Sequence, residues 1–250
     1  MNKKRIFNKI LLIIAVIIFT VSAVFLILHF IPDNEDLGDF KNSADVEVEL
    51  PENPIDFAAL KEKNPDVIGW ITVKDMDIDY PVLQSGIDKK EDFYLKHDID
   101  GKWKNAGSIY VQRYNNDSFL DRNTILYGHH LSDKSMFTPL WDLRKAEEFK
   151  KHDTVYIYTP GHILTYKIFS AFIYDDRHIL NAFDFSNAEE YSAFLDDCFN
   201  PRTLVKNVRE DVKVTPEDRI ITLSTCTNSY YYSDERFLVV AVLKNDTKTK

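Results

Sequence analysis

The chain of 250 residues has only two cysteines, Cys198 and Cys226, and neither lies in a CxxC or Cys/His cluster. This argues against a structural zinc site, which needs four closely spaced ligands. With 7 glycines and 9 prolines, the composition is neither collagen-like nor that of a disordered polymer. Positive charge is in deficit as well, because the formal net charge is −9. Since phosphate binding needs clustered Lys and Arg, we expect no nucleic-acid partner.

The first 54 residues differ in composition from the rest. Residues 1–9 form a basic head, and residues 10–31 are almost continuously apolar. At about 1.5 Å per helical residue this run spans a hydrocarbon core of about 30 Å, and it exceeds the ~7–15 apolar residues of a cleaved signal peptide. The sequence therefore predicts a single-pass transmembrane signal-anchor with a cytoplasmic N-terminus. The acidic residues 32–54 predict an extracellular tether, followed by a globular domain over residues 55–250.

The pattern of that domain is typical of a β-rich fold. Short β-branched and aromatic runs between turn residues predict eight strands. They cover residues 67–73, 78–83, 106–112, 124–129, 154–158, 163–174, 219–225 and 237–243. Helices are predicted at 55–61, 135–151 and 186–199, the last with Ser186 as N-cap and Glu189 completing a capping box, and a short helix or turn at 92–97. Without regular βαβ alternation, we expect a mainly β fold with inserted helices, a closed or partly closed barrel.

The last two predicted strands frame a possible reactive site. Cys226 ends the first of them and Arg236 begins the second. If the strands pair as antiparallel neighbours, both side chains lie at one edge of the sheet, where a fixed cation favours the thiolate over the thiol. The alternative interpretation is a buried cysteine and an arginine in a surface ion pair. Cys198 lies on the apolar face of the predicted helix 186–199, so packing is its expected role.

A reactive cysteine needs a proton donor or acceptor, and seven histidines are available. His129 and His130 stand out because they end a predicted buried strand, as Cys226 does. Gly128 before them permits a close approach of another group. Since neighbouring strand residues face opposite sides, one ring faces the site and the other turns away. Periodicity alone does not choose between the two.

The sequence TLSTC at residues 222–226, with Arg236 at the start of the last strand, resembles the signature of the sortases. Gly128-His129 is similar to the catalytic histidine motif of that family. The helices at 55–61 and 186–199, and the segments YGHH and DKSMF, resemble the class B sortases. Two departures are visible: His130 follows the expected histidine, and Thr227-Asn228 lacks an acidic residue found in some relatives.

The resemblance implies an eight-stranded sortase-like β-barrel with the activity of a cysteine transpeptidase at a Gram-positive cell surface. Cys226 would attack a C-terminal sorting signal of NPxTx or LPxTx type after its Thr. Arg236 would stabilise the oxyanion, and His129 would act as general acid and base. Ser224 would line the sorting-signal groove, with residues 175–185 and the helix 186–199 as one wall. The implied partners are secreted proteins that carry the signal, and an amine of peptidoglycan or its lipid-linked precursor as acceptor.

Other functions remain open at this point. A surface cysteine protease would share the acylation step but use water as acceptor, and a pilus-type sortase would use another protein. A binding ectodomain with a Cys198–Cys226 disulfide is the alternative from a different class. No acidic cluster resembles a calcium loop, so we expect neither a metal nor another cofactor.

Overall fold

The computed structural model describes residues 50–227 and 234–250. The predicted membrane anchor at residues 10–31 and most of the predicted tether lie outside these ranges. Within them, no helix is long and apolar enough to cross a membrane. Near the start of the described chain, the Asn53 side chain donates to the Thr159 carbonyl and the Lys250 amide donates to the Pro51 carbonyl.

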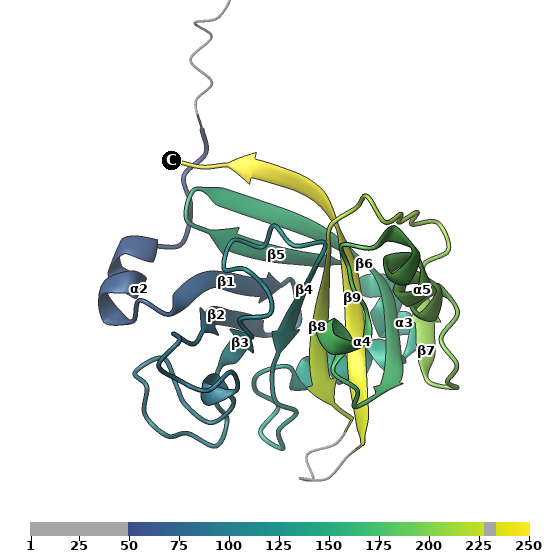
Figure 1. Ribbon diagram of the computed structural model, residues 1–250, viewed down its shortest axis with the longest axis horizontal. Helices are drawn as coiled ribbons and strands as arrows, with labels where there is room; N and C mark the ends of the chain where they lie inside the picture. The colour runs from purple at the N-terminus through teal and green to yellow at the C-terminus, as the bar shows by residue number, and fades with distance from the viewer. Residues whose placement is uncertain (1–49, 228–233) are drawn as a thin grey trace, which may run out of the picture. The chain divides into compact units, whose positions relative to one another are not determined.

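Eight strands close into a barrel, as predicted, and a ninth extends its sheet (Figure 1). In spatial order the sheet runs β5 (Thr154–Thr159), β1 (Val67–Val73), β2 (Ile78–Gln84), β3 (Ile109–Val111), β4 (Asn123–Tyr127), β8 (Ile220–Cys226), β9 (Glu235–Lys248), β6 (His162–Asp175) and β7 (Lys206–Val208). Antiparallel pairing of β5 with β6 closes the ring. The β2–β3 and β4–β8 pairs are parallel, and the other pairs are antiparallel.

Most strand bounds differ from the prediction by a residue, and β3, β4 and β9 differ by more; β9 is longer than the predicted strand 237–243 at both ends. β3 covers only three residues, because the segment before it turns at Gly107, which has a positive φ of 57°. β4 ends at Tyr127, so His129 lies beyond the strand end and not within it. The short β7 was not predicted, because Lys206–Val208 is polar and its pairing to β6 is set by tertiary contacts.

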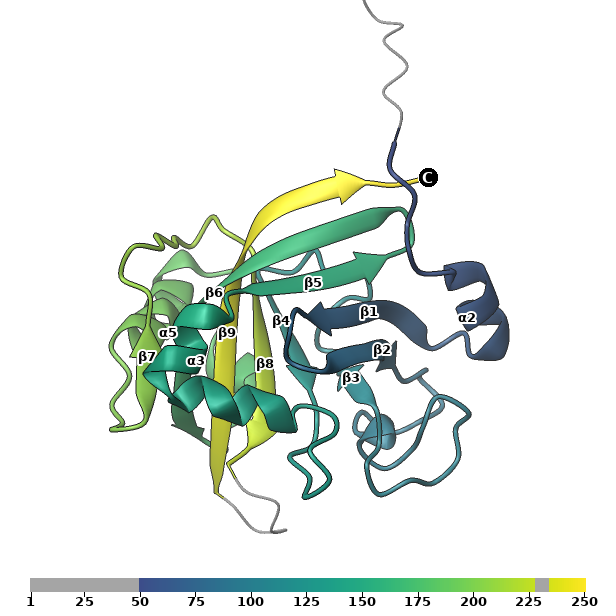
Figure 2. The ribbon, with the colours of Figure 1, turned by 180° about the vertical axis from the view of Figure 1, so that it is seen from behind.

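The helices lie outside the ring of strands (Figures 1 and 2). They are α2 (Phe57–Lys63), the 3-10 helices η2 (Phe93–Leu95) and η3 (Thr138–Arg144), α3 (Ala146–Lys151), α4 (Ile179–Ala182) and α5 (Ala188–Phe199). The single helix predicted over residues 135–151 is therefore η3 followed by α3. The predicted cap of α5 is wrong by one residue: Asn187 Oδ1 accepts from the Glu189 and Glu190 amides, while the Ser186 hydroxyl bonds to Asp184.

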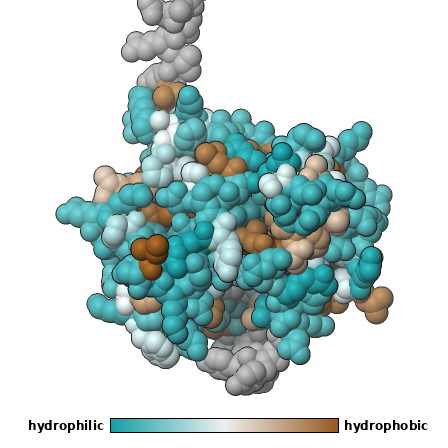
Figure 3. All heavy atoms as spheres, viewed as in Figure 1, coloured by the Kyte–Doolittle hydropathy of each residue, from teal (hydrophilic) through white to brown (hydrophobic). Residues whose placement is uncertain are grey.

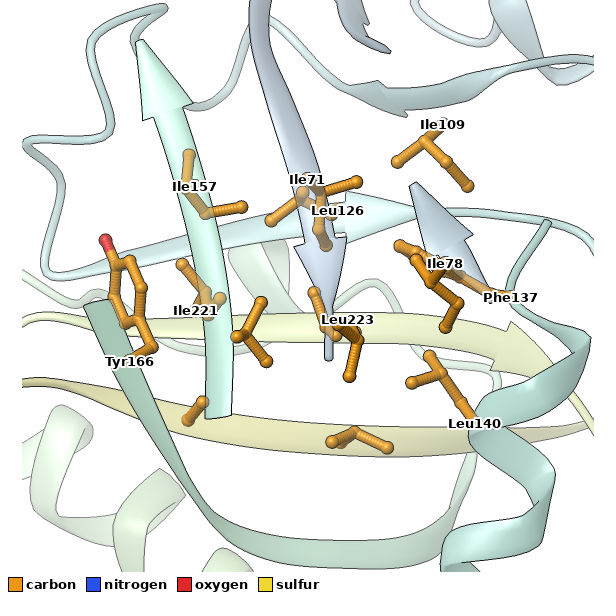
Figure 4. Packing of buried hydrophobic residues seen from close by; sticks show 14 of the residues in the cluster. Ile71, Ile78, Ile109, Leu126, Phe137, Leu140, Ile157, Tyr166, Ile221 and Leu223 are labelled. Carbon is orange, nitrogen blue, oxygen red and sulfur yellow. The ribbon is translucent and has the colours of Figure 1, made fainter. Parts of the chain in front are cut away.

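The strands use their two faces differently. Inward-facing residues form the barrel core, in which Ile71, Leu126 and Leu223 are fully buried (Figure 4). On the outer face, α5 packs its apolar side against β4, β6, β8 and β9 through a second buried cluster. On the side seen in Figure 1, hydrophilic residues predominate among the described residues and hydrophobic ones occur in small separate groups (Figure 3). The core thus occupies the inside of the ring and leaves part of its outer face for a site.

Candidate functional site

The antiparallel pairing of β8 with β9 brings Cys226 and Arg236 together. The two residues are direct cross-strand partners, and both side chains are partly exposed. Since their strand neighbours Thr225 and Phe237 are buried on the other face, the thiol and the guanidinium share the outer face. The predicted juxtaposition of a cysteine and a fixed cation is confirmed at the level of the backbone.

The parallel pairing of β4 with β8 places His129 and His130, which follow β4, at the same edge of the sheet as Cys226. Tyr127 lies opposite Ser224, and the Gly128 amide donates to the Ser224 carbonyl at 3.1 Å. A Cβ atom at Gly128 would lie 2.5 Å from Ile109 Cδ1 and 2.6 Å from Phe137 Cδ2, so this position needs glycine. The chain that leaves β4 here continues directly into His129 and His130.

Each histidine ring is held by a different backbone carbonyl. His129 Nε2 donates to the Leu95 carbonyl at 2.8 Å, and His130 Nδ1 donates to the carbonyl of Cys226 itself at 2.9 Å. Burial lowers the pKa of His129 below its ordinary value; the Leu95 hydrogen bond opposes this effect, and the charge of Lys96 adds to it. Near neutral pH, His129 is therefore mostly uncharged, with its hydrogen on Nε2 and a lone pair on Nδ1.

All four residues singled out in the sequence, Cys226, His129, Arg236 and Ser224, line one cavity of about 660 Å³. His130 lines it as well. Its walls include Leu95, Lys96 and Asn105, and residues 128–132 and 175–179. A cleft of this size, with a thiol, three imidazoles and two guanidinium groups in its lining, can hold a peptide and carry out acyl transfer on its carbonyl.

The floor of the cavity contains side chains that the sequence did not single out. Tyr110 on β3 and Tyr127 on β4 are paired across the strands and line the cavity beside Ser224. His178, at the N-cap of α4, lines it as well. Tyr127 lies in the YGHH segment and His178 in the predicted wall 175–185, but neither was given a role. Tyr110 reaches the site through strand register. The alternation of faces with Cys226 could have suggested Tyr127 once the β4–β8 pairing was known.

The predicted groove wall is only partly correct. Residues 175–179 line the cavity, but no residue of α5 does so among the described lining residues. α5 instead uses its apolar face, which includes Tyr191, Phe194 and Leu195, to cover the outer face of the sheet. An amphipathic helix of this kind is more stable with that face packed than with it bordering an open groove.

The two cysteines differ in environment and are not joined. Both thiols are free; Cys198 is fully buried in α5 and Cys226 is partly exposed. Burial raises the pKa of Cys198 well above its ordinary value, so this residue remains a thiol. The alternative of a Cys198–Cys226 disulfide is therefore wrong. In the described part of the chain, no group of three or more His, Cys, Asp or Glu side chains is arranged to hold a metal ion.

Comparison with known proteins gives consistent matches. Residues 71–244 match the family model described as the sortase domain. The chain is 36% identical over 185 residues to sortase B of Staphylococcus aureus, covering 74% of this chain and 73% of that protein. It is 35% identical to sortase B of Listeria monocytogenes, covering 72% and 70%.

Solved structures agree with the sequence matches. The structure of Clostridium perfringens sortase B aligns with a TM-score of 0.66 and 31% identity, over 76% of this chain and all of that chain. A Staphylococcus aureus sortase B–substrate complex aligns with the same TM-score and 35% identity, over 76% of this chain and 84% of that one.

Proposed function

This chain belongs to the sortase family, within class B, and from that membership we propose that it attaches secreted proteins to the cell wall of a Gram-positive bacterium. Sortases are cysteine transpeptidases, and so is this protein. Its substrate is a protein with a C-terminal sorting signal of NPxTx or LPxTx type, which is cleaved after the Thr. The acceptor is an amine of peptidoglycan or of its lipid-linked precursor.

The pairing of Cys226 with Arg236 carries the catalytic assignment. The Cys226 thiolate attacks the carbonyl carbon of the Thr, and the electron pair of that carbonyl moves to its oxygen. The oxyanion accepts hydrogen bonds from the Arg236 guanidinium, whose planar fork of donors keeps its charge throughout. When the tetrahedral intermediate collapses, the C–N bond breaks and a thioester with Cys226 remains.

His129 moves the protons of both half-reactions. As imidazolium it protonates the leaving amine, and as imidazole it takes a proton from the incoming acceptor amine, which then attacks the thioester and releases Cys226. The hydrogen bond from Nε2 to the Leu95 carbonyl supports Nδ1 as the nitrogen that exchanges the proton. Because burial disfavours the charged ring, the imidazolium form is a minority near neutral pH, and we expect a modest turnover.

The proposed location rests on the sequence before the described residues. The apolar run of residues 10–31 supports a single-pass anchor with a cytoplasmic N-terminus and an extracellular catalytic domain. Such an anchor holds the enzyme in the membrane from which its substrates emerge, which raises their effective concentration at the site.

Mass spectrometry of the full-length chain with NPxTx and LPxTx peptides and an added amine tests the function. We expect a thioester on Cys226, an amine-capped product, and no reaction after Cys226→Ala. A cleaved product without the amine would indicate a hydrolase, or an acceptor of another kind such as a pilus subunit. The absence of a thioester with every peptide would contradict the proposal.

A further inference from the structure

A second cavity of about 610 Å³, the flanking cleft, lies beside the catalytic cavity, and no described residue lines both. Its lining comes from two segments: 114–123, which leads into β4, and 180–190, which runs from α4 into α5. Ile179 of α4 lines the catalytic cavity, whereas the next residue, Leu180, lines the flanking cleft. A peptide that leaves the catalytic cavity past α4 therefore enters this cleft.

The wall between the two cavities is one side chain thick at Tyr114. The Tyr114 ring lines the flanking cleft and packs edge-on against the His178 ring of the catalytic cavity, with 4.9 Å between centroids. Asn123, which also lines the flanking cleft, is the register partner of Ile220, six residues before Cys226 on β8. At about 3.3 Å per strand residue, the cleft begins about 20 Å from the nucleophile.

The flanking cleft is acidic. Its described lining contains three acids and one base, a formal net charge of −2. Arg122 is that base, and its guanidinium donates to a backbone carbonyl of another loop. Among the acids, Asp121 accepts from Asn115 Nδ2, but Asp184 and Glu190 form no ion pair with a described residue. The cleft therefore attracts a positively charged ligand.

An unused hydrogen-bond donor lies in the same cleft. Asn123 is only 1% exposed, and its Oδ1 accepts from the Thr222 hydroxyl at 2.9 Å. Its Nδ2 is buried and has no hydrogen-bond partner among the described residues. Since buried amide donors are nearly always paired, this atom indicates a place for an acceptor such as a carbonyl oxygen of a ligand.

Together these groups fit an extended peptide with a basic side chain. A peptide carbonyl can accept from Asn123 Nδ2, and an ammonium or guanidinium group can pair with Asp184 and Glu190. The aliphatic stem of Lys or Arg can lie against the rings of Phe183 and Phe185, which also line the cleft. An acidic peptide would be repelled, and a neutral sugar offers no positive charge to the two carboxylates.

The length of the sorting signal brings its upstream flank to this cleft. In the thioester of the proposed function, Cys226 is joined to the Thr of the motif, and the chain before that Thr stays on the enzyme. The four motif residues that end at Thr span about 13 Å when extended. Since the cleft begins about 20 Å from Cys226, it lies level with residues from about the second position before the motif.

We propose that the flanking cleft binds the polypeptide that precedes the sorting motif and favours Lys or Arg at about the second to fourth position before it. The inference rests on the proposed function, since the bound segment belongs to the sorting-signal protein. It adds a recognition site outside the catalytic cavity, whose residues take no part in breaking the peptide bond.

Peptides with one motif and three different flanks test the cleft in the full-length Cys226→Ala variant, in which no turnover occurs. The second to fourth positions before the motif are all Lys, all Ser or all Glu. At low ionic strength, calorimetry should show the Lys flank binding about three- to tenfold more tightly than the Ser flank, and the Glu flank more weakly. Lysines moved about seven positions further upstream should lose most of this gain, because they lie beyond the cleft.

The double variant Asp184→Asn/Glu190→Gln removes two charges and keeps the oxygens that accept from the Ser186 and Asp184 amides. It should abolish the preference for the Lys flank. Glu189→Gln is the matched control, because Glu189 lies in the same turn of α5 but is not among the described lining residues. Thermal melting shows whether each variant is folded. Equal binding of the three flanks, or a preference that survives the double variant, would overturn the proposal.

Two further outcomes separate this inference from its alternatives. If the double variant alters the binding of a soluble peptidoglycan fragment and not that of the flanked peptides, the cleft holds the acceptor and the proposal is wrong. If the parent enzyme forms no thioester with any peptide, yet the charge-dependent preference for the Lys flank is present, the proposed reaction fails and the flanking cleft remains a peptide site. A thioester with no effect of the flank would refute the inference alone.

Discussion

His129 and His130 are adjacent in the chain, but their hydrogen bonds suit them to different tasks. The bond from His129 to the Leu95 carbonyl leaves a lone pair on Nδ1 for proton exchange. The bond from His130 to the Cys226 carbonyl fixes the backbone of the nucleophile. The first arrangement suits an acid and base, and the second suits a residue that positions the end of β8.

Exchange of each histidine for asparagine tests this division. His129→Asn should lower kcat/KM for thioester formation by about 10²–10⁴-fold, the usual contribution of a general acid. His130→Asn should cost less than about tenfold, because the asparagine amide can still donate to the Cys226 carbonyl. Single-turnover acylation rates measure both effects. The reverse order would make His130 the proton donor.

Substitution of Lys96 offers a way to change the pKa of His129. Burial is the main reason that the pKa of His129 is low, and the charge of Lys96 lowers it further. Lys96→Gln should therefore raise the pKa of His129. An ordinary thiol ionises near pH 8.5, so the acidic limb of the kcat/KM profile reports the histidine. We expect that limb to move to higher pH and the plateau to rise, since more imidazolium is present.

Lys102→Gln is the control for that profile, because Lys102 makes a surface ion pair with Asp100 and does not act on His129. It should leave the acidic limb in place. A profile of Lys96→Gln that coincides with that of the parent enzyme would mean that His129 does not govern the acidic limb.

At the scale of elements, one face of β8 packs into the barrel core and the other face lines the candidate site. Leu223 is fully buried inside the barrel, whereas Ser224 lines the catalytic cavity. Leu223→Ala should lower the free energy of unfolding by about 2–5 kcal/mol, because it leaves a cavity in the core. Ser224→Ala should alter peptide kinetics with little change in stability. Urea denaturation and peptide turnover, measured on both variants, check this separation.

The N-terminus of α5 gives a second test at this scale. Asn187 Oδ1 accepts from two backbone amides of the first turn, so Asn187→Ala should cost about 1 kcal/mol of stability. Ser186→Ala should cost less, because its hydroxyl bonds only to Asp184. Chemical denaturation of the two variants compares them. A larger loss of stability for Ser186→Ala would indicate that Ser186, as inferred from the sequence, is the N-cap of α5.

The sequence predicted the elements better than their junctions. The strands at 67–73 and 220–226 were nearly correct, because alternation and β-branched residues mark a half-buried strand directly. The cap of α5 was misplaced because Ser186 and Asn187 are both good capping residues. Local motifs singled out Cys226, His129 and Arg236, and all three line the cavity. Tyr110 was not singled out, because strand register alone brings it there, and His178 was included only as part of the predicted wall 175–185.

At the scale of the whole molecule, the two thiols report on the integrity of the fold. Cys226 is partly exposed and Cys198 fully buried, and neither is oxidised. Titration with a thiol reagent should therefore detect one reactive thiol in the native chain and two after denaturation. Two reactive thiols without denaturant would mean that α5 opens readily. No reactive thiol in the native chain would contradict the exposed nucleophile.

The position of β9 has a consequence for biosynthesis. This strand follows all the other described strands in the sequence, and it pairs with β8 on one side and with β6 on the other. Until β9 has been synthesised and paired, β8 and β6 each have an unpaired edge and Arg236 is not held beside Cys226. The thiol of Cys226 is then without its cationic neighbour. Closure of the barrel and the approach of Arg236 to Cys226 are therefore a single event, and under the proposed function an incomplete chain cannot carry out acyl transfer.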